Sequence, residues 1–121
     1  MAVVIAAAAF AGESAVVPLM GQETLLQRQA RKDAALFVLD VRTPEEFASG
    51  HVPGAVNVPH DQLASRVAEV PRDKDVVVYC RSGRRSQIAA DILTANGFKR
   101  VSHLEGDIIA WQEKARPIEK P

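Results

Sequence analysis

Residues 76–86 read Val76-Val77-Val78-Tyr79-Cys80-Arg81-Ser82-Gly83-Arg84-Arg85-Ser86, and residues 87–93 continue Gln-Ile-Ala-Ala-Asp-Ile-Leu. A β-branched apolar run predicts a buried strand, and the amphipathic pattern after the glycine predicts a helix. The single cysteine of the chain, Cys80, therefore falls at the carboxyl end of a strand, in a short basic loop. Backbone N–H groups of such a loop and the N-terminus of the next helix are sources of positive potential.

Two interpretations of Cys80 follow. A thiol in positive surroundings has a pKa below its reference value of about 8.5 and reacts as a thiolate, whereas a lone free cysteine is more commonly buried and inert. The loop carries three arginines, Arg81, Arg84 and Arg85, which an inert core thiol does not need. We therefore interpret Cys80 as a nucleophile and the loop as a cradle for an anionic substrate.

The composition is that of one soluble globular domain. The chain has 121 residues, of which 47% are hydrophobic and 25% charged. Fifteen basic residues balance fifteen acidic ones, so the charge pattern does not indicate a nucleic-acid partner. One cysteine and three scattered histidines, His51, His60 and His103, predict neither a disulfide framework nor a metal site, and we expect no cofactor.

The N-terminal segment differs in kind from the rest. Residues 2–11 are apolar throughout, and Ala9-Phe10-Ala11 before Gly12 resembles a small-x-small cleavage site, although no Lys or Arg precedes the run. The run is too short to span a bilayer, so we expect no stable membrane insertion. Residues 1–11 are thus either a signal peptide, which we favour and which predicts a periplasmic or exported protein, or an apolar extension of a cytoplasmic one. The domain proper is expected at residues 16–119.

Apolar runs alternate with helical patterns through this domain. Strands are predicted at 16–18, 36–41, 55–59, 76–79 and 101–104, and helices at 22–32, 44–50, 61–68, 86–96 and 108–115. This alternation predicts an α/β domain with a mainly parallel central sheet of about five strands flanked by helices. Ligands of open α/β sheets bind beyond the carboxyl ends of the strands. Because Asp40-Val41-Arg42 and Cys80 both lie at such ends, we expect them to form one site.

Three ordered segments resemble the signatures of the rhodanese (thiosulfate sulfurtransferase) family. They are Asp40 to Phe47 with Gly50 to Pro59, the loop Cys80 to Ser86, and Leu104 to Trp111. The resemblance spans about residues 20–119. Asp107 stands where the family often has a second Gly, and Ala115-Arg116 precedes Pro117 where a Gly–hydrophobic pair is common. Both departures fall in the predicted C-terminal helix, so we expect little effect on the site.

The resemblance implies a three-layer rhodanese-like domain that transfers sulfur. Cys80 would take a sulfane sulfur from thiosulfate or a similar small anionic donor, and would pass it from a persulfide to a thiophilic acceptor. The acceptor is cyanide in the assay, and a thiol or an acceptor protein in the cell. The expected substrate-binding residues are Arg81, Ser82, Gly83, Arg84, Arg85 and Ser86. Arg84 and Arg85 are predicted to hold the sulfonate oxygens, while Arg81 either joins them or faces solvent.

Asp40, Arg42, Glu46 and His51 are expected to support the site. Asp40 would accept loop N–H groups, Arg42 would pair with Glu46, and His51 would brace the turn at Pro53-Gly54. Trp111 is predicted in the core, and His60 and His103 at the surface or in loops.

Two other functions compete with this prediction. A cysteine phosphatase or arsenate reductase of the related cell-cycle phosphatase type has a Cys-x5-Arg loop, but Arg85 comes five residues after Cys80, one short of that spacing. A shorter loop fits a single sulfur atom and crowds a phosphate. The second alternative is a non-catalytic rhodanese-like sulfur-carrier or binding module, against which the intact cysteine and basic loop argue.

Overall fold

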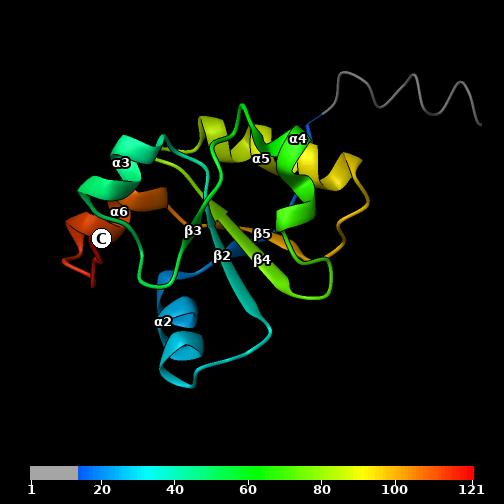
Figure 1. The fold of residues 1–121 in the computed structure, drawn as a ribbon. Helices are drawn as coiled ribbons and strands as arrows, with labels where there is room; N and C mark the ends of the chain where they lie inside the picture. The colour runs from blue at the N-terminus through cyan, green and yellow to red at the C-terminus, as the bar shows by residue number, and fades with distance from the viewer. Residues whose placement is uncertain (1–13) are drawn as a thin grey trace, which may run out of the picture.

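A five-stranded sheet forms the centre of the computed structural model, which describes residues 14–121 (Figure 1). Its strands are β1 (Leu19–Met20), β2 (Leu36–Asp40), β3 (Val56–Asn57), β4 (Asp75–Tyr79) and β5 (Val101–Leu104). They lie in the order β1-β5-β4-β2-β3, and every pair of neighbours is parallel. The predicted α/β class and parallel sheet are confirmed. The apolar segment 1–11 lies outside the described residues.

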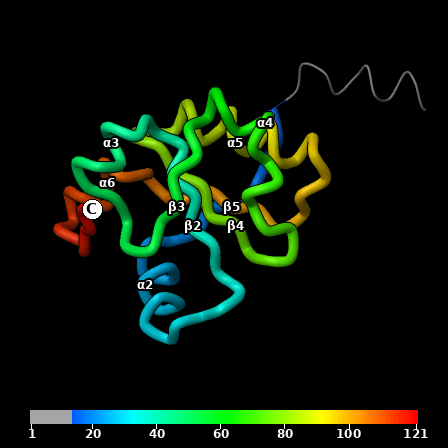
Figure 2. Tube along the Cα trace, in the orientation of Figure 1, coloured from blue at the N-terminus to red at the C-terminus, as the bar shows by residue number. Residues whose placement is uncertain are grey.

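Helices cover both faces of the sheet. They are α2 (Gln22–Ala30), α3 (Pro44–Ser49), α4 (Leu63–Arg66) with a following 3-10 turn (Val67–Glu69), α5 (Arg84–Ala95) and α6 (Asp107–Glu113). In the view of Figures 1 and 2, α4 and α5 lie above the sheet and α2 lies below it, which gives three layers. Within residues 14–121, none of the helices has the length and apolar character needed to cross a membrane.

Strand β4 joins the two cores because its side chains alternate between the faces of the sheet. Val76, Val78 and Cys80 belong to the core beneath α4 and α5. Val77 and Tyr79 belong to the opposite core, which contains Trp111 of α6. The indole of Trp111 is fully buried, so its predicted core position is confirmed.

Two element boundaries differ from prediction in ways that affect the site. The edge strand is β1 at Leu19–Met20 rather than at 16–18, because Val16 is fully exposed and pairing with β5 starts only at the carbonyl of Pro18, which accepts from the N–H of His103. Helix α5 begins at Arg84 rather than at residue 86, directly after Gly83. Arg84 and Arg85 are therefore in the first turn of a helix.

Candidate active site

The carboxyl ends of β2 and β4 bring the two predicted polar clusters together. The strands are neighbours, and Asp40 is in register with Tyr79, the residue before Cys80. The Tyr79 hydroxyl donates to Asp40 Oδ2 over 2.6 Å, and it accepts the backbone N–H of Val52 at 3.0 Å. The two segments thus form one site, as the order of strands and loops predicted.

Cys80 lies at the floor of this site. Its residue is 1% exposed, and its Sγ lies 3.0 Å from the backbone N of Gly83 and 3.5 Å from Ser86 Oγ. Gly83 has a φ of 126°, which L side chains rarely adopt, and a Cβ there would meet Asp107 Oδ2 at 3.3 Å. Glycine therefore allows the loop to curl until its N–H points at the sulfur.

A buried carboxylate supports the loop from below. Asp107, 2% exposed, accepts the backbone N–H of Cys80 at 2.9 Å, and its Oδ1 lies 3.0 Å from Ser86 Oγ. His103 Nε2 lies 2.9 Å from Asp107 Oδ2 and 2.9 Å from Ser86 Oγ. Burial of Asp107 disfavours its charged form, but the hydrogen bonds from His103 and from the backbone of Cys80 outweigh burial and lower the pKa of Asp107.

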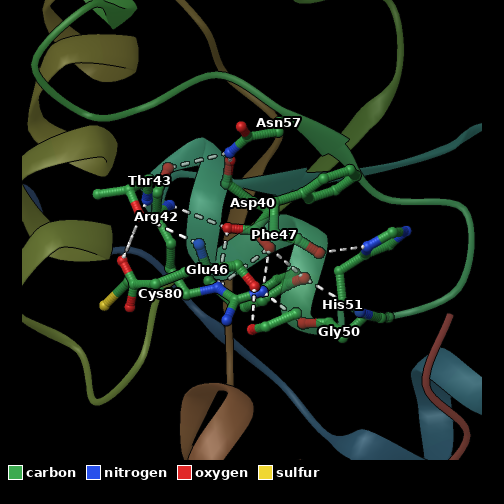
Figure 3. Close-up of polar contacts among 12 residues, drawn as sticks. Asp40, Arg42, Thr43, Glu46, Phe47, Gly50, His51, Asn57 and Cys80 are labelled. Atoms are coloured by element: carbon green, nitrogen blue, oxygen red, sulfur yellow. Dashed lines mark hydrogen bonds and ion pairs between the residues drawn. The ribbon is translucent and has the colours of Figure 1, made fainter. Parts of the chain in front are cut away.

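A buried ion pair fixes the segment after β2. The guanidinium of Arg42 contacts Asp40, with Nη2 2.6 Å from Oδ2, and donates to the carbonyl of Gly50 (Figure 3). The amide of Asn57 donates to the backbone carbonyls of Asp40 and Arg42. The prediction that Arg42 pairs with Glu46 is wrong, because Arg42 precedes the helix and turns back onto the strand end. Burial of the Tyr79 hydroxyl, together with the charge of Asp40, raises its pKa far above the ordinary value.

His51 contacts both the end of α3 and the residue that holds the Pro53-Gly54 turn. Its Nδ1 lies 2.9 Å from the carbonyl oxygen of Phe47, and its ring stacks on that of Phe47 with centroids 3.7 Å apart (Figure 3). Glu119 Oε1 accepts the N–H of Gly54, and His51 Nε2 lies 3.6 Å from the same oxygen. His51 thus reaches the predicted turn through Glu119.

The three loop arginines have different surroundings. Arg85 forms a two-pronged ion pair with Glu46, with N–O distances of 2.6 and 3.0 Å. This contact, with the hydrogen bonds from Thr43, lowers the pKa of Glu46 to about 2. Arg81 and Arg84 are exposed, and their side chains make no ion pair with the described part of the chain. Of the three loop arginines, Arg81 and Arg84 are thus the two whose charge is not paired within residues 14–121.

This arrangement suits covalent chemistry at sulfur. A single thiol lies 3.0 Å from a backbone N, and the segment that follows it carries two exposed arginines, Arg81 and Arg84. Among residues 14–121, no three His, Cys, Asp or Glu side chains gather as a metal site would require.

Comparison with known proteins identifies the family of the chain. A family model described as Rhodanese-like domain matches residues 21–114. The chain belongs to the rhodanese-like family. A sulfurtransferase of Allochromatium vinosum is 46% identical over 99 residues, which are 82% of this chain and 92% of that protein. The thiosulfate sulfurtransferase GlpE of Pseudomonas syringae is 35% identical over 86 residues, 71% of this chain and 81% of the relative.

Solved structures agree with this assignment to the rhodanese-like family. A rhodanese-related protein from Thermoplasma volcanium superposes with a TM-score of 0.76 at 29% identity, covering 86% of this chain and 99% of the other. The rhodanese-like domain of an Anabaena protein gives a TM-score of 0.77 at 28% identity, covering 88% and 81%. The family and its relatives support sulfur transfer as the general chemistry of this rhodanese-like chain.

The sequence did not predict the position of two residues at this rhodanese-like site. His103 was expected at the surface or in a loop, and Asp107 was expected to have little effect on the site, but both lie directly beneath the cysteine loop. For Asp107 the sequence did contain a signal, because this residue stands where the family frequently has a glycine. It retains a left-handed backbone, with a φ of 54°. A non-glycine residue at such a position indicates a side chain with a role of its own.

Proposed function

We propose that the protein is a sulfurtransferase that moves a sulfane sulfur from thiosulfate, or a similar small anionic donor, to a thiophilic acceptor through a persulfide on Cys80. The observation that carries the proposal is the position of Cys80 Sγ, 3.0 Å from the Gly83 backbone N, in a segment that also carries two exposed arginines. A backbone N–H donor of this kind stabilises negative charge on sulfur without any rearrangement.

The first step is a displacement at sulfur. The Cys80 thiolate attacks the outer sulfur of thiosulfate, the S–S bond of the donor breaks, and sulfite leaves with the electron pair of that bond. A Cys80 persulfide remains, its terminal sulfur carrying the negative charge next to the loop N–H. Arg81 and Arg84, exposed and close to Cys80 in the sequence, would attract the dianionic donor and hold its oxygens, since guanidinium groups bind such oxyanions in a fork.

The second step returns the enzyme to its starting state. A nucleophilic acceptor, cyanide in the assay and a thiol or acceptor protein in the cell, attacks the terminal sulfur and releases the Cys80 thiolate. This sequence predicts ping-pong kinetics. The carboxylate of Asp107 holds Cys80 and Ser86 from the buried side of the loop during both steps.

The experiment is thiocyanate formation from thiosulfate and cyanide by the parent protein and by its Cys80→Ser and Cys80→Ala variants. We expect turnover by the parent only, with parallel lines in double-reciprocal plots. Thermal unfolding of all three proteins serves as the control for folding. Turnover by either folded variant within a few-fold of the parent would exclude Cys80 as the sulfur carrier.

We also propose that residues 1–11 direct export of the protein. The support is their continuous apolar sequence, ending in Ala9-Phe10-Ala11. Sequencing the N-terminus of protein purified from its native cells tests this proposal. A mature chain beginning at Gly12 supports export, and a chain that retains the apolar segment contradicts it.

A further inference from the structure

The contact between Arg85 and Glu46 has the geometry that an arginine uses for an anionic substrate. Both terminal nitrogens of the guanidinium face the two carboxylate oxygens, at 2.6 and 3.0 Å. A sulfonate presents two oxygens to a guanidinium in the same forked manner. Glu46 therefore occupies, from within the chain, the face of Arg85 that an anionic donor would use.

Glu46 is held in this position by its own helix. Its Oε1 accepts the backbone N–H and the hydroxyl of Thr43, each at 3.1 Å, and the Thr43 hydroxyl accepts the N–H of Glu46 in return. This capping box fixes the start of α3. Glu46 is thus anchored at its backbone and at its carboxylate, and it does not swing freely away from Arg85.

The ion pair also changes the net charge of the cysteine loop and the first turn of α5. Three arginines lie within the first six residues of the cysteine loop and its helix, yet Glu46 neutralises one of them. The remaining positive charge comes from Arg81 and Arg84. Attraction of a dianion is reduced more strongly than attraction of a monoanion when one charge is removed, because the Coulomb energy scales with the product of the charges.

We propose that Glu46 is a specificity-determining residue that competes with anionic donors for Arg85 and so weakens the capture of doubly charged donors such as thiosulfate. This inference rests on the proposed sulfur transfer and adds that the site discriminates among donors by charge. The donors it favours are sulfane-sulfur compounds that carry a single negative charge.

The test uses Glu46→Gln, with Glu45→Gln as the matched control. Glutamine at this position retains the capping box, since Gln and Glu serve equally as its third residue, while it removes the charge that faces Arg85. Glu45 lies one residue earlier in the same helical turn and is exposed, so its variant removes an equal charge from the same helix end without touching the contact with Arg85. Thermal unfolding confirms that each variant is folded.

Affinity for thiosulfate is measured by titration calorimetry with each substitution placed in the Cys80→Ser protein, where no sulfur is transferred. We expect Glu46→Gln to tighten binding roughly three- to tenfold, the scale of one charge-assisted contact, and Glu45→Gln to leave it within about 1.5-fold. In the protein that retains Cys80, Glu46→Gln should lower KM for thiosulfate and leave kcat unchanged. Adding Arg85→Ala should abolish the gain from Glu46→Gln.

Three results would overturn the proposal: unchanged or weaker thiosulfate binding by Glu46→Gln, an equal gain in Glu45→Gln, or a gain that persists without Arg85. If Cys80 transfers no sulfur in the parent, the proposed function fails on its own assay. The affinities of the Cys80→Ser series would still decide the role of Glu46 separately.

Discussion

Asp107→Gly is the substitution that most directly tests how the cysteine loop is supported. The carboxylate receives three partners on the buried side of the loop: the N–H of Cys80, the hydroxyl of Ser86 and Nε2 of His103. Glycine adopts the left-handed backbone of this position without strain, whereas alanine would add a backbone cost to the loss of the side chain. The change therefore isolates the contribution of the carboxylate.

The expected loss of stability follows from these contacts. A buried donor left without an acceptor costs about 1–3 kcal/mol. Glycine relieves the strain of the left-handed backbone at this position, which offsets about 0.5–1 kcal/mol of that loss of stability. Since two of the donors retain part of their hydrogen bonding to each other, we expect the free energy of unfolding to fall by about 2–4 kcal/mol. For a domain of this size the melting temperature should fall by roughly 10–20 °C.

The pH dependence of this loss has a defined sign. Hydrogen bonds lower the pKa of the folded Asp107 below its ordinary value of 3.8, against the opposing effect of burial. A carboxylate with a lowered pKa stabilises the fold fully above its unfolded value, and its contribution disappears as the pH falls through the folded value. The part of the stability difference between parent and Asp107→Gly that comes from the ionised carboxylate should therefore be lost as the pH falls below about 4.

Thermal and urea unfolding at pH 7 and at several lower pH values measure these quantities. Glu113→Gln is the matched control, because Glu113 is an exposed acid on the same helix. It should shift the free energy of unfolding by less than about 0.5 kcal/mol. A destabilisation by Asp107→Gly no larger than that of the control, or one that grows on acidification, would refute the role given to the carboxylate.

Three shorter predictions concern other parts of the molecule. Arg84→Ala should raise KM for thiosulfate by roughly tenfold with a smaller fall in kcat, because it removes an exposed guanidinium four residues after Cys80; an unchanged KM would remove Arg84 from donor binding. Tyr79→Phe should lower the free energy of unfolding by about 1–3 kcal/mol in urea titrations, since the N–H of Val52 and a carboxylate oxygen of Asp40 lose their shared partner. Removal of residues 1–11 should leave thiocyanate formation unchanged, because the side chains placed at the site all come from residue 40 onward; a loss of turnover would assign the segment to the domain.

The elements that position the site could be predicted from local sequence. The apolar run before Cys80 and the helical pattern after Gly83 are short-range signals, and the alternation of such runs determines a parallel sheet. The meeting of Asp40 with the cysteine loop followed from the rule that the carboxyl ends of parallel strands share one edge. These features depend on periodicity and chain order, which the sequence displays directly.

The pairing of charged side chains could not be predicted in the same way. Arg42 and Glu46 have the spacing of a helical pair, but Arg42 lies before the helix, so the spacing does not apply. The partner of Glu46 is Arg85, 39 residues away, and Cys80 rests on Asp107, 27 residues away. Such contacts depend on how the layers of the domain pack. No local sequence pattern shows that Arg42 and Arg85 form ion pairs while Arg81 and Arg84 remain exposed.

The central claim is that Cys80 carries the transferred sulfur, and intact-protein mass spectrometry tests it most directly. The reduced parent protein is incubated with thiosulfate, desalted and weighed, alongside Cys80→Ser treated identically. We expect the parent to gain the mass of one sulfur atom and to release one equivalent of sulfite, and we expect cyanide to remove the added mass as thiocyanate. A parent protein of unchanged mass, or an equal gain by Cys80→Ser, would contradict the claim.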